Sequence, residues 1–384
     1  MGTKLFSDII TFTRASSATR VNSSGLVETV ASNQPRFDYD PITLQPKGLL
    51  VEEQRTNLIR SSQDIGSWGL YGGSHTASQD STSPMGDTSA WTLNDTDTSA
   101  YSGRVRSAST STSTMYTFSC YVKQGTSSAG FSIWLMGNGS SAFFQGTIAW
   151  SSGVPVATGW KSSYAGGGWY RVSYAFNSGV YTSLAVYLLP AITSIVATGS
   201  TVFWGAQLEV GTFPTSYIPT TTAASTRAAD VAKITGANFS SWYNQTEGTL
   251  FVEWDAPTEA NPASSIGALS VSDGTTNERI QICRYAGAST ISFLAIDDGV
   301  VQYNDYGTLS FNGASKSALA YKTNDFIGAS GGSLGAADTS GTIPTTTQAE
   351  IGFGNGITYT NGHIRRVAYY PRRLTDAELQ ALTA

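Results

Sequence analysis

The chain has 384 residues and a formal net charge of −5, with 13% charged residues, 11% aromatic residues and only 2 His. The length suggests more than one domain, and the aromatic content is too high for a disordered chain. The negative charge balance excludes the electrostatic footprint of a nucleic-acid-binding protein, and two histidines cannot build a His-rich zinc site. Abundant Gly, Ser, Thr, Tyr and Trp favour an all-β protein over a helical one.

No stretch of the sequence has the apolar length of a signal peptide core or of a membrane span. We therefore expect synthesis in the cytoplasm without a signal peptide, and no membrane insertion. Cys120 and Cys283 lie far apart in the sequence, and we interpret both as buried free thiols rather than a disulfide.

Residues 1–58 contain short alternating stretches and turn signals at 22–25 (NSSG) and 45–48 (QPKG). They predict short strands and hairpins, too few to form an independent core. We expect this N-terminal region to pack on a neighbour or on another subunit and to serve as an attachment region.

Residues 59–222 predict a jelly roll, because short strands with period-two alternation recur between Gly, Ser and Asn turns. The clearest strands are 115–122, 169–176, 184–189 and 201–209. A Pro/Thr/Ala-rich stretch over 213–236 predicts an extended connector.

Residues 223–384 repeat the all-β pattern and predict a second sandwich. Strands are expected at 248–255, 280–285, 290–296, 318–323, 349–353 and 363–370. The period then changes to that of a short helix near the C-terminus. Thr375 and Glu378 have the spacing of a capping box, and Leu374, Leu379 and Leu382 can lie on one helix face.

Two sequence blocks carry a family resemblance. The first comprises residues 12–16, 18–21, 35–41 and 48–58, and the second comprises 204–209, 214–220 and 226–230. Together they resemble the phage head-spike/tail-fibre family. The region between them looks like a carbohydrate-binding-module jelly roll. Residues 248–252 and 363–370, which run into the C-terminal helix, resemble laminin-G-like and concanavalin-A-like lectin domains.

The resemblance implies a protein on the surface of a bacteriophage-like virion, with other virion proteins as partners through the N-terminal region. It also implies a homo-oligomer, with a trimer favoured. The function hypothesis is a non-catalytic spike or fibre that binds host-cell-surface polysaccharide for adsorption. The alternatives are a polysaccharide depolymerase, or a purely structural head decoration or anchor.

The depolymerase alternative depends on Glu253, Asp255 and Glu259. Concanavalin-A-like glycoside hydrolases carry a similar run of carboxylates, which period-two alternation puts on one face of a strand. Pro257 interrupts that strand, and acidic residues at strand ends are common as solvated turn residues. We therefore expect no catalytic site.

A structural calcium ion is a second, less favoured expectation. Asp297, Asp298 and Asp305 form an acidic loop cluster of the kind that hard cations prefer, and lectin-like sandwiches often carry a structural calcium ion. Solvated turn aspartates are the favoured interpretation, and no other cofactor is expected.

Aromatic residues in loops are the candidates for glycan binding, because Trp and Tyr rings offer flat, amphipathic surfaces to sugars. Aromatics that alternate within strong strands are better read as core. The loop candidates, each equally open to an edge-of-core reading, are Trp68, Tyr71, Trp150, Trp160, Tyr164, Tyr303 and Tyr306.

Overall fold

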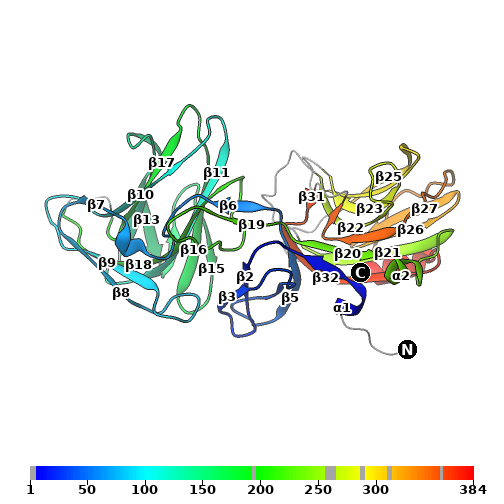
Figure 1. Cartoon of the computed structure of the whole chain (residues 1–384), viewed down its shortest axis with the longest axis horizontal. Coiled ribbons are helices and arrows are strands. Elements are labelled where there is room, and N and C mark those ends of the chain that lie inside the picture. Colours follow the sequence, from blue (N-terminus) through cyan, green and yellow to red (C-terminus); the bar gives the residue numbers. More distant parts are fainter. Residues whose placement is uncertain (1–5, 193–195, 256–264, 286–289, 309–313, 355–357) are drawn as a thin grey trace.

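A computed structural model describes residues 6–192, 196–255, 265–285, 290–308, 314–354 and 358–384. Within these ranges the chain forms two β-sandwiches, which lie at the left and right of Figure 1. Strands of the N-terminal segment lie between and below them. The predicted all-β fold of tandem sandwiches is confirmed.

Two 6-stranded antiparallel sheets form the middle sandwich. The first sheet contains, in spatial order, β14 (Val154–Val156), β13 (Ser141–Ser151), β12 (Gly130–Gly137), β17 (Ser183–Leu189), β10 (Ser102–Ser109) and β7 (Gly69–Gly72). The second contains β15 (Lys161–Tyr164), β16 (Trp169–Asn177), β11 (Met115–Gln124), β18 (Gly199–Val210), β9 (Ala90–Asp95) and β8 (His75–Ser81). The four strands predicted here correspond to β11, β16, β17 and β18.

Period-two alternation on β11 explains the core of the middle sandwich. Phe118, Cys120 and Val122 point between the two sheets and are fully buried. Tyr121 points to the opposite face, where Val27 and other residues from outside the sheet cover it. Both faces of this strand are therefore packed.

Two 7-stranded antiparallel sheets form the C-terminal sandwich. The first contains β1 (Thr11–Thr13), β20 (Val231–Thr235), β29 (Gln348–Ile351), β22 (Ile266–Ser272), β23 (Arg279–Arg284), β24 (Thr290–Asp297) and β25 (Val300–Thr308). The second contains β28 (Ser333–Leu334), β27 (Asp325–Ser330), β26 (Ser315–Lys322), β21 (Glu247–Trp254), β32 (Gly362–Tyr370), β5 (Pro46–Val51) and β4 (Phe37–Tyr39).

The remaining elements are short. They are α1 (Phe6–Ile9), β2 (Ala18–Val21), β3 (Val27–Val30), β6 (Arg55–Asn57), η1 (Ile65–Ser67), β19 (Ser225–Arg227), α2 (Ala237–Ser240), β30 (Phe353–Gly354), β31 (Thr358–Tyr359) and α3 (Asp376–Thr383).

The N-terminal segment is built into both halves of the molecule. Strand β1 pairs with β20, and β5 pairs with β32, so this segment extends both sheets of the C-terminal sandwich. The hairpin β2–β3 packs Val27 against the outer face of the second middle sheet, and β6 pairs with β19. The segment thus has no core of its own and completes those of its neighbours.

A buried charge network, which we call the junction network, ties these parts together. It consists of Arg14, Arg36, Glu52, Arg227 and Asp230, all 5% exposed or less. Ion-pair distances are 3.1 Å for Arg14–Asp230, 2.8 Å for Arg36–Glu52 and 2.5 Å for Arg227–Glu52, and Arg36 also pairs with Asp230. All five residues come from the two blocks that resemble the phage family. These blocks therefore meet in space as a structural junction.

The C-terminal helix matches its prediction. Thr375 is the N-cap of α3, and a complete capping box with Glu378 is present. Leu374 and Leu379 are buried, and Leu382 packs against the same cluster over β26 and β27. The apolar face of the helix therefore covers the second sheet of the C-terminal sandwich.

Cys120 and Cys283 are both free and buried, as predicted. Burial raises the pKa of each thiol, to about 11 for Cys283. Among the helices that the structure describes, none has the length and apolar character needed to cross a membrane.

Candidate functional site

Three of the seven aromatic candidates lie in the core. Trp68, Trp150 and Tyr303 are only 2%, 9% and 3% exposed. Trp68 lies under the Arg106 guanidinium, and the Tyr303 hydroxyl accepts a hydrogen bond from the Gly328 amide. These rings follow the edge-of-core interpretation and offer no face to a ligand, because packing on the sandwich interior covers them.

Trp160 and Tyr164 are more exposed than Trp150. Trp160 is half-buried and packs on Phe144 and Tyr174 at the edge of the same core. Tyr164 is 38% exposed, and its hydroxyl accepts a hydrogen bond from the Gly168 amide. Only Tyr164 of these three presents an open ring.

An exposed aromatic patch lies on the outer face of the first C-terminal sheet. Tyr306 on β25 and Tyr285 after β23 are 45% and 46% exposed, and their rings meet edge to face at 5.4 Å and 79°. Asn304 donates from Nδ2 to the Tyr306 hydroxyl at 3.2 Å, and Ser292 donates to Asn304 Oδ1 at 3.3 Å. Ser292 is only 3% exposed and supports Asn304 from beneath. We call the three exposed residues Tyr285, Asn304 and Tyr306 the Tyr285–Tyr306 patch.

The strand register explains why this patch faces outward. Tyr303 lies opposite Ala295, and both belong to the core between the sheets. Because side chains alternate along a strand, Asn304 and Tyr306 both point away from that core. Tyr306 lies opposite Ser292 on the outer side of β24. The sequence pattern points to Tyr306 but not to Tyr285, which becomes its neighbour only when β23, β24 and β25 align.

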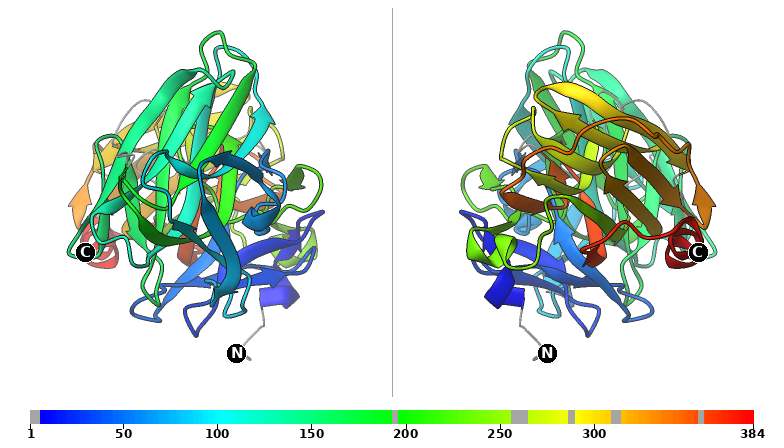
Figure 2. Two further views of the ribbon diagram at one scale, coloured as in Figure 1. Left: turned by 90° about the vertical axis from the view of Figure 1, so that its left-hand side faces the viewer. Right: turned by 90° about the vertical axis from the view of Figure 1, so that its right-hand side faces the viewer.

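A second aromatic cluster covers the outer face of the first middle sheet. The left view of Figure 2 shows the strands of the middle sandwich from that end of the molecule. Trp134 is 4% exposed and lies under Tyr71, Tyr101 and Tyr187, with ring centroids 5.4–5.9 Å from its own. Its indole N–H has no acceptor among the described residues. Burial, together with Tyr187 and Tyr101, raises the pKa of Tyr71.

The loop pattern in the sequence points only to Tyr71 of this cluster. The missed signal is the run Gly130–Gly137, which has Phe131, Ile133 and Leu135 on one face and Trp134 and Met136 on the other. A strand that is apolar on both faces indicates that something covers the outer one. Here the rings cover one another and leave limited open surface.

The carboxylates of the depolymerase alternative do not form an open catalytic pair in the part of the chain that can be described. Asp255 accepts from His363 Nδ1 at 2.9 Å and from the His363 amide at 3.0 Å, and Arg365 lies 3.5 Å away. Although burial favours the neutral acid, the His363 hydrogen bonds and charge, together with the Lys47 charge, outweigh it and lower the pKa of Asp255. Glu253 lies opposite Lys316 and Arg366 on the neighbouring strands. Glu259 lies outside the described residues.

His363 is held between two carboxylates. Its Nε2 lies 2.8 Å from Asp38 of β4, and Asp255 binds the other nitrogen. Burial lowers the pKa of this histidine, but both carboxylates raise it, and the net direction is upward. The histidine thus links the N-terminal segment to the C-terminal sandwich.

The acidic residues considered for calcium are engaged in local hydrogen bonds. Asp297 accepts from the Thr342 hydroxyl, and Asp305 accepts from the Ala336 amide at 2.8 Å. Asp298 lies in the turn after β24 with φ +49°. No group of three potential metal ligands occurs in the described ranges. Structural calcium stays a prediction.

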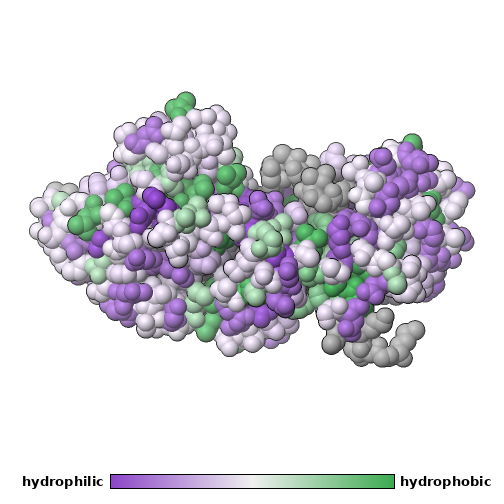
Figure 3. Space-filling view, viewed as in Figure 1, coloured by the Kyte–Doolittle hydropathy of each residue, from purple (hydrophilic) through white to green (hydrophobic). Residues whose placement is uncertain are grey.

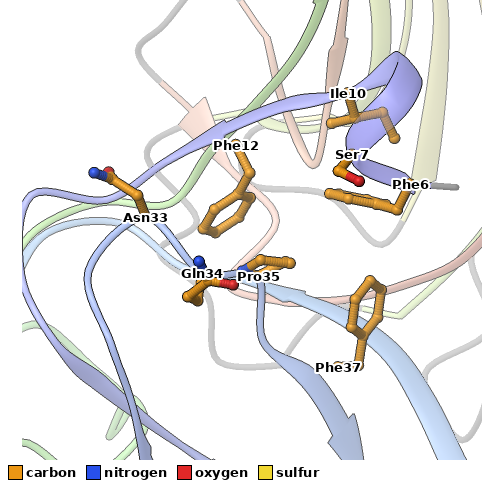
Figure 4. Close-up of a pocket in the computed structure, with 8 residues that line it drawn as sticks. All are labelled: Phe6, Ser7, Ile10, Phe12, Asn33, Gln34, Pro35 and Phe37. Atoms are coloured by element: carbon orange, nitrogen blue, oxygen red, sulfur yellow. The ribbon is translucent and has the colours of Figure 1, made fainter.

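An apolar pocket of about 440 Å³ lies in the N-terminal segment (Figure 4). The rings of Phe6, Phe12 and Phe37 line it together with Ile10 and Pro35. Its lining residues include no charged side chain that could orient a substrate. Figure 3 shows hydrophobic residues dispersed among hydrophilic ones over the visible face.

No protein-family profile and no curated protein sequence matches the chain. Among solved structures, the CBM40 module of Ruminococcus gnavus IT-sialidase bound to α2,3-sialyllactose is similar, with 18% identity and a TM-score of 0.33 over 38% of this chain and 88% of that one. Domains LG4–5 of mouse laminin α1 give 8% identity and a TM-score of 0.25 over 70% and 85% of the chains. The SAP-like pentraxin of Limulus polyphemus gives 9% and 0.29 over 36% and 70%. Similarity at this level carries no argument about function.

Proposed function

We propose that the chain is a non-catalytic surface protein of a bacteriophage-like particle that binds host-cell glycans. The observation that carries glycan binding is the Tyr285–Tyr306 patch. It combines two half-exposed tyrosine rings and their hydroxyls with the exposed side-chain amide of Asn304. Sugars offer apolar C–H faces to such rings and hydroxyl groups to such amides. The role on a particle is supported by the sequence blocks that build the junction network.

Binding at one such patch is expected to be weak. An aromatic contact contributes about 1 kcal/mol beyond the apolar area that it covers. Many copies on one particle would raise the overall affinity by roughly 10²–10⁴. A homo-oligomer, with a trimer as the expected form, would place several patches together.

Attachment to the particle is assigned to the N-terminal segment, with another protein of the particle as its partner. Ile42, Leu44 and Phe37 are 60%, 45% and 39% exposed, which is unusual for apolar side chains of one short segment. Deleting the whole segment would remove β1, β4 and β5 from their sheets. Ile42→Asp and Leu44→Asp are therefore the cleaner test, and we expect both to reduce incorporation into particles without changing the unfolding midpoint.

The glycan proposal is tested with a glycan array and retention on host cells. We expect the double variant Tyr285→Ala/Tyr306→Ala to lose about fivefold in affinity for each aromatic ring removed. Val300→Ala is a matched control, because Val300 is 61% exposed on the same strand and lies outside the patch.

Two results would count against the proposal. One is the absence of binding to any polysaccharide from the host surface. The other is equal binding by the double variant and the Val300→Ala control. Release of reducing ends from host polysaccharide, lost in Glu253→Gln, would instead favour the depolymerase.

A further inference from the structure

A second pocket, whose lining includes a lysine, lies where the N-terminal segment meets the middle sandwich. Its volume is about 280 Å³. The lining residues are Ser24, Gly25, Leu26, Pro41, Thr82, Ser83, Pro84, Lys123, Ala165, Gly166, Gly167 and Trp169. They come from the β2–β3 turn, from residue 41, from the loop after β8, from β11, from the loop between β15 and β16, and from the first residue of β16.

Lys123 supplies the one charged group among these lining residues. It lies opposite Trp169 and Val202 on the outer face of the second middle sheet. Its Cε is 3.3 Å from the position that a Cβ on Gly168 would take, so the lysine stem lies across the glycine loop. No carboxylate within ion-pair distance of its ammonium is found in the described part of the chain.

The glycine loop brings its backbone close to the pocket. Gly166, Gly167 and Gly168 all have positive φ, at +82°, +59° and +82°. A Cβ on Gly166 would lie 3.2 Å from the Pro41 carbonyl oxygen, which shows how closely the loop approaches the N-terminal segment. The three glycines therefore permit both the turn and this approach.

Several other polar groups of the pocket have no protein partner in the described ranges. The hydroxyls of Ser24 and Thr82 and the amide of Gly167 make no hydrogen bond there. Leu26, Pro84 and Trp169 provide an apolar wall. Unpaired hydroxyl and amide groups beside an apolar wall suit a polyol with an apolar face.

We propose that this pocket binds one acidic sugar residue, with the sugar carboxylate on the Lys123 ammonium. The volume lies just below the range for ligand pockets, about 300–1,000 Å³, and suits a single ring rather than a long chain. An unpaired cation in a chain of net charge −5 selects an anionic ligand. The inference goes beyond the proposed function, because it adds a site on the other sandwich that does not involve the Tyr285–Tyr306 patch.

The test is titration of the full chain with sodium D-glucuronate, followed by ligand-observed NMR. Methyl D-glucoside, acetate and inorganic phosphate are titrated in parallel. We expect glucuronate to bind more tightly than the other three, because only glucuronate satisfies both the charge and the hydroxyl groups. Binding should weaken as salt is raised.

Lys123→Gln keeps most of the side-chain stem and removes the charge, and we expect it to lower glucuronate affinity about tenfold. Lys123→Arg should retain most of the affinity. Tyr306→Ala should leave glucuronate binding unchanged even if it abolishes binding to host polysaccharide, so the two proposals fail separately. The unfolding midpoint of each variant checks its fold.

Three outcomes would overturn the inference. The first is unchanged glucuronate affinity in a folded Lys123→Gln variant. The second is equal binding of methyl D-glucoside, which would make the charge irrelevant. The third is equal binding of acetate or phosphate, which would reduce the pocket to a simple anion site.

Discussion

Replacing Glu52 by Gln would test whether the junction network holds the N-terminal segment in place. Glu52 Oε2 accepts from Arg36 at 2.8 Å, Arg227 at 2.5 Å and the Ser216 hydroxyl at 2.6 Å, and Oε1 accepts from the Ser216 amide at 2.8 Å. Gln keeps the volume, removes the charge and turns an NH₂ group toward these donors.

The magnitude follows from the charges that remain. Without Glu52, the three buried arginines Arg14, Arg36 and Arg227 would share Asp230 as the remaining carboxylate of the network. Removing one partner from a buried ion pair costs about 3–5 kcal/mol, because the other charge stays buried without compensation. We expect a loss of this size in the free energy of unfolding.

The assay is equilibrium unfolding in urea, followed by tryptophan fluorescence and by far-UV circular dichroism. Two sandwiches can unfold in separate steps, so the transition that shifts must be identified by comparing both signals. Glu28→Gln is the matched control. It removes a carboxylate from the Arg20–Glu28 pair, whose side chains are 25% and 35% exposed, and should cost less than about 1 kcal/mol.

The pH dependence gives an independent check. Burial alone would raise the pKa of Glu52, but Arg227, Arg36 and the Ser216 hydrogen bonds outweigh it, and the pKa lies far below the ordinary range. The stabilisation is therefore present above the unfolded-state pKa of about 4.3 and is lost as pH falls through the folded-state pKa. If the free energy of unfolding of Glu52→Gln lay within about 1 kcal/mol of the wild-type value, as expected for the Glu28→Gln control, the reasoning would be refuted.

Three further predictions concern a buried histidine, a helix cap and the two thiols. Because the pKa of His363 is raised, its contribution to stability should be full below pH of about 6.5 and decline as pH rises through the folded-state pKa; a stability profile unchanged in Asp38→Asn would contradict this. Thr375→Ala should destabilise α3 by about 1 kcal/mol, seen as faster amide exchange confined to that helix, and unchanged exchange would show that the cap is dispensable. Cys120 and Cys283 should react with Ellman's reagent only after unfolding, because burial raises the pKa of both thiols; rapid labelling of the native chain would show that one is accessible.

Local pattern was a good guide wherever a strand had one apolar face. The predicted strands around β11, β16 and β32 agree with the structure to within a few residues, because period-two alternation depends only on neighbouring residues. It was a poor guide for β12, where both faces are apolar and the alternation disappears. The capping box of α3 was predictable for the same local reason.

Burial of individual aromatic rings could not be predicted in this way. Trp68 follows a Gly/Ser stretch that suggests an exposed loop, yet it lies in the core because η1 turns it under Arg106. Tyr285 and Tyr306 became neighbours through the register of three strands. Exposure depends on what another part of the chain places over a ring, and sequence separation does not record it.

The sequence by itself determined the all-β class, the period of most strands, the C-terminal cap and the two free thiols, since these depend on local spacing and composition. The tertiary structure alone decided which charges pair. Arg14, Arg36 and Glu52 are separated from Arg227 and Asp230 by the whole middle sandwich in sequence, but they meet in one buried network. A buried charge requires a partner, and strand pairing across the junction is what supplies it.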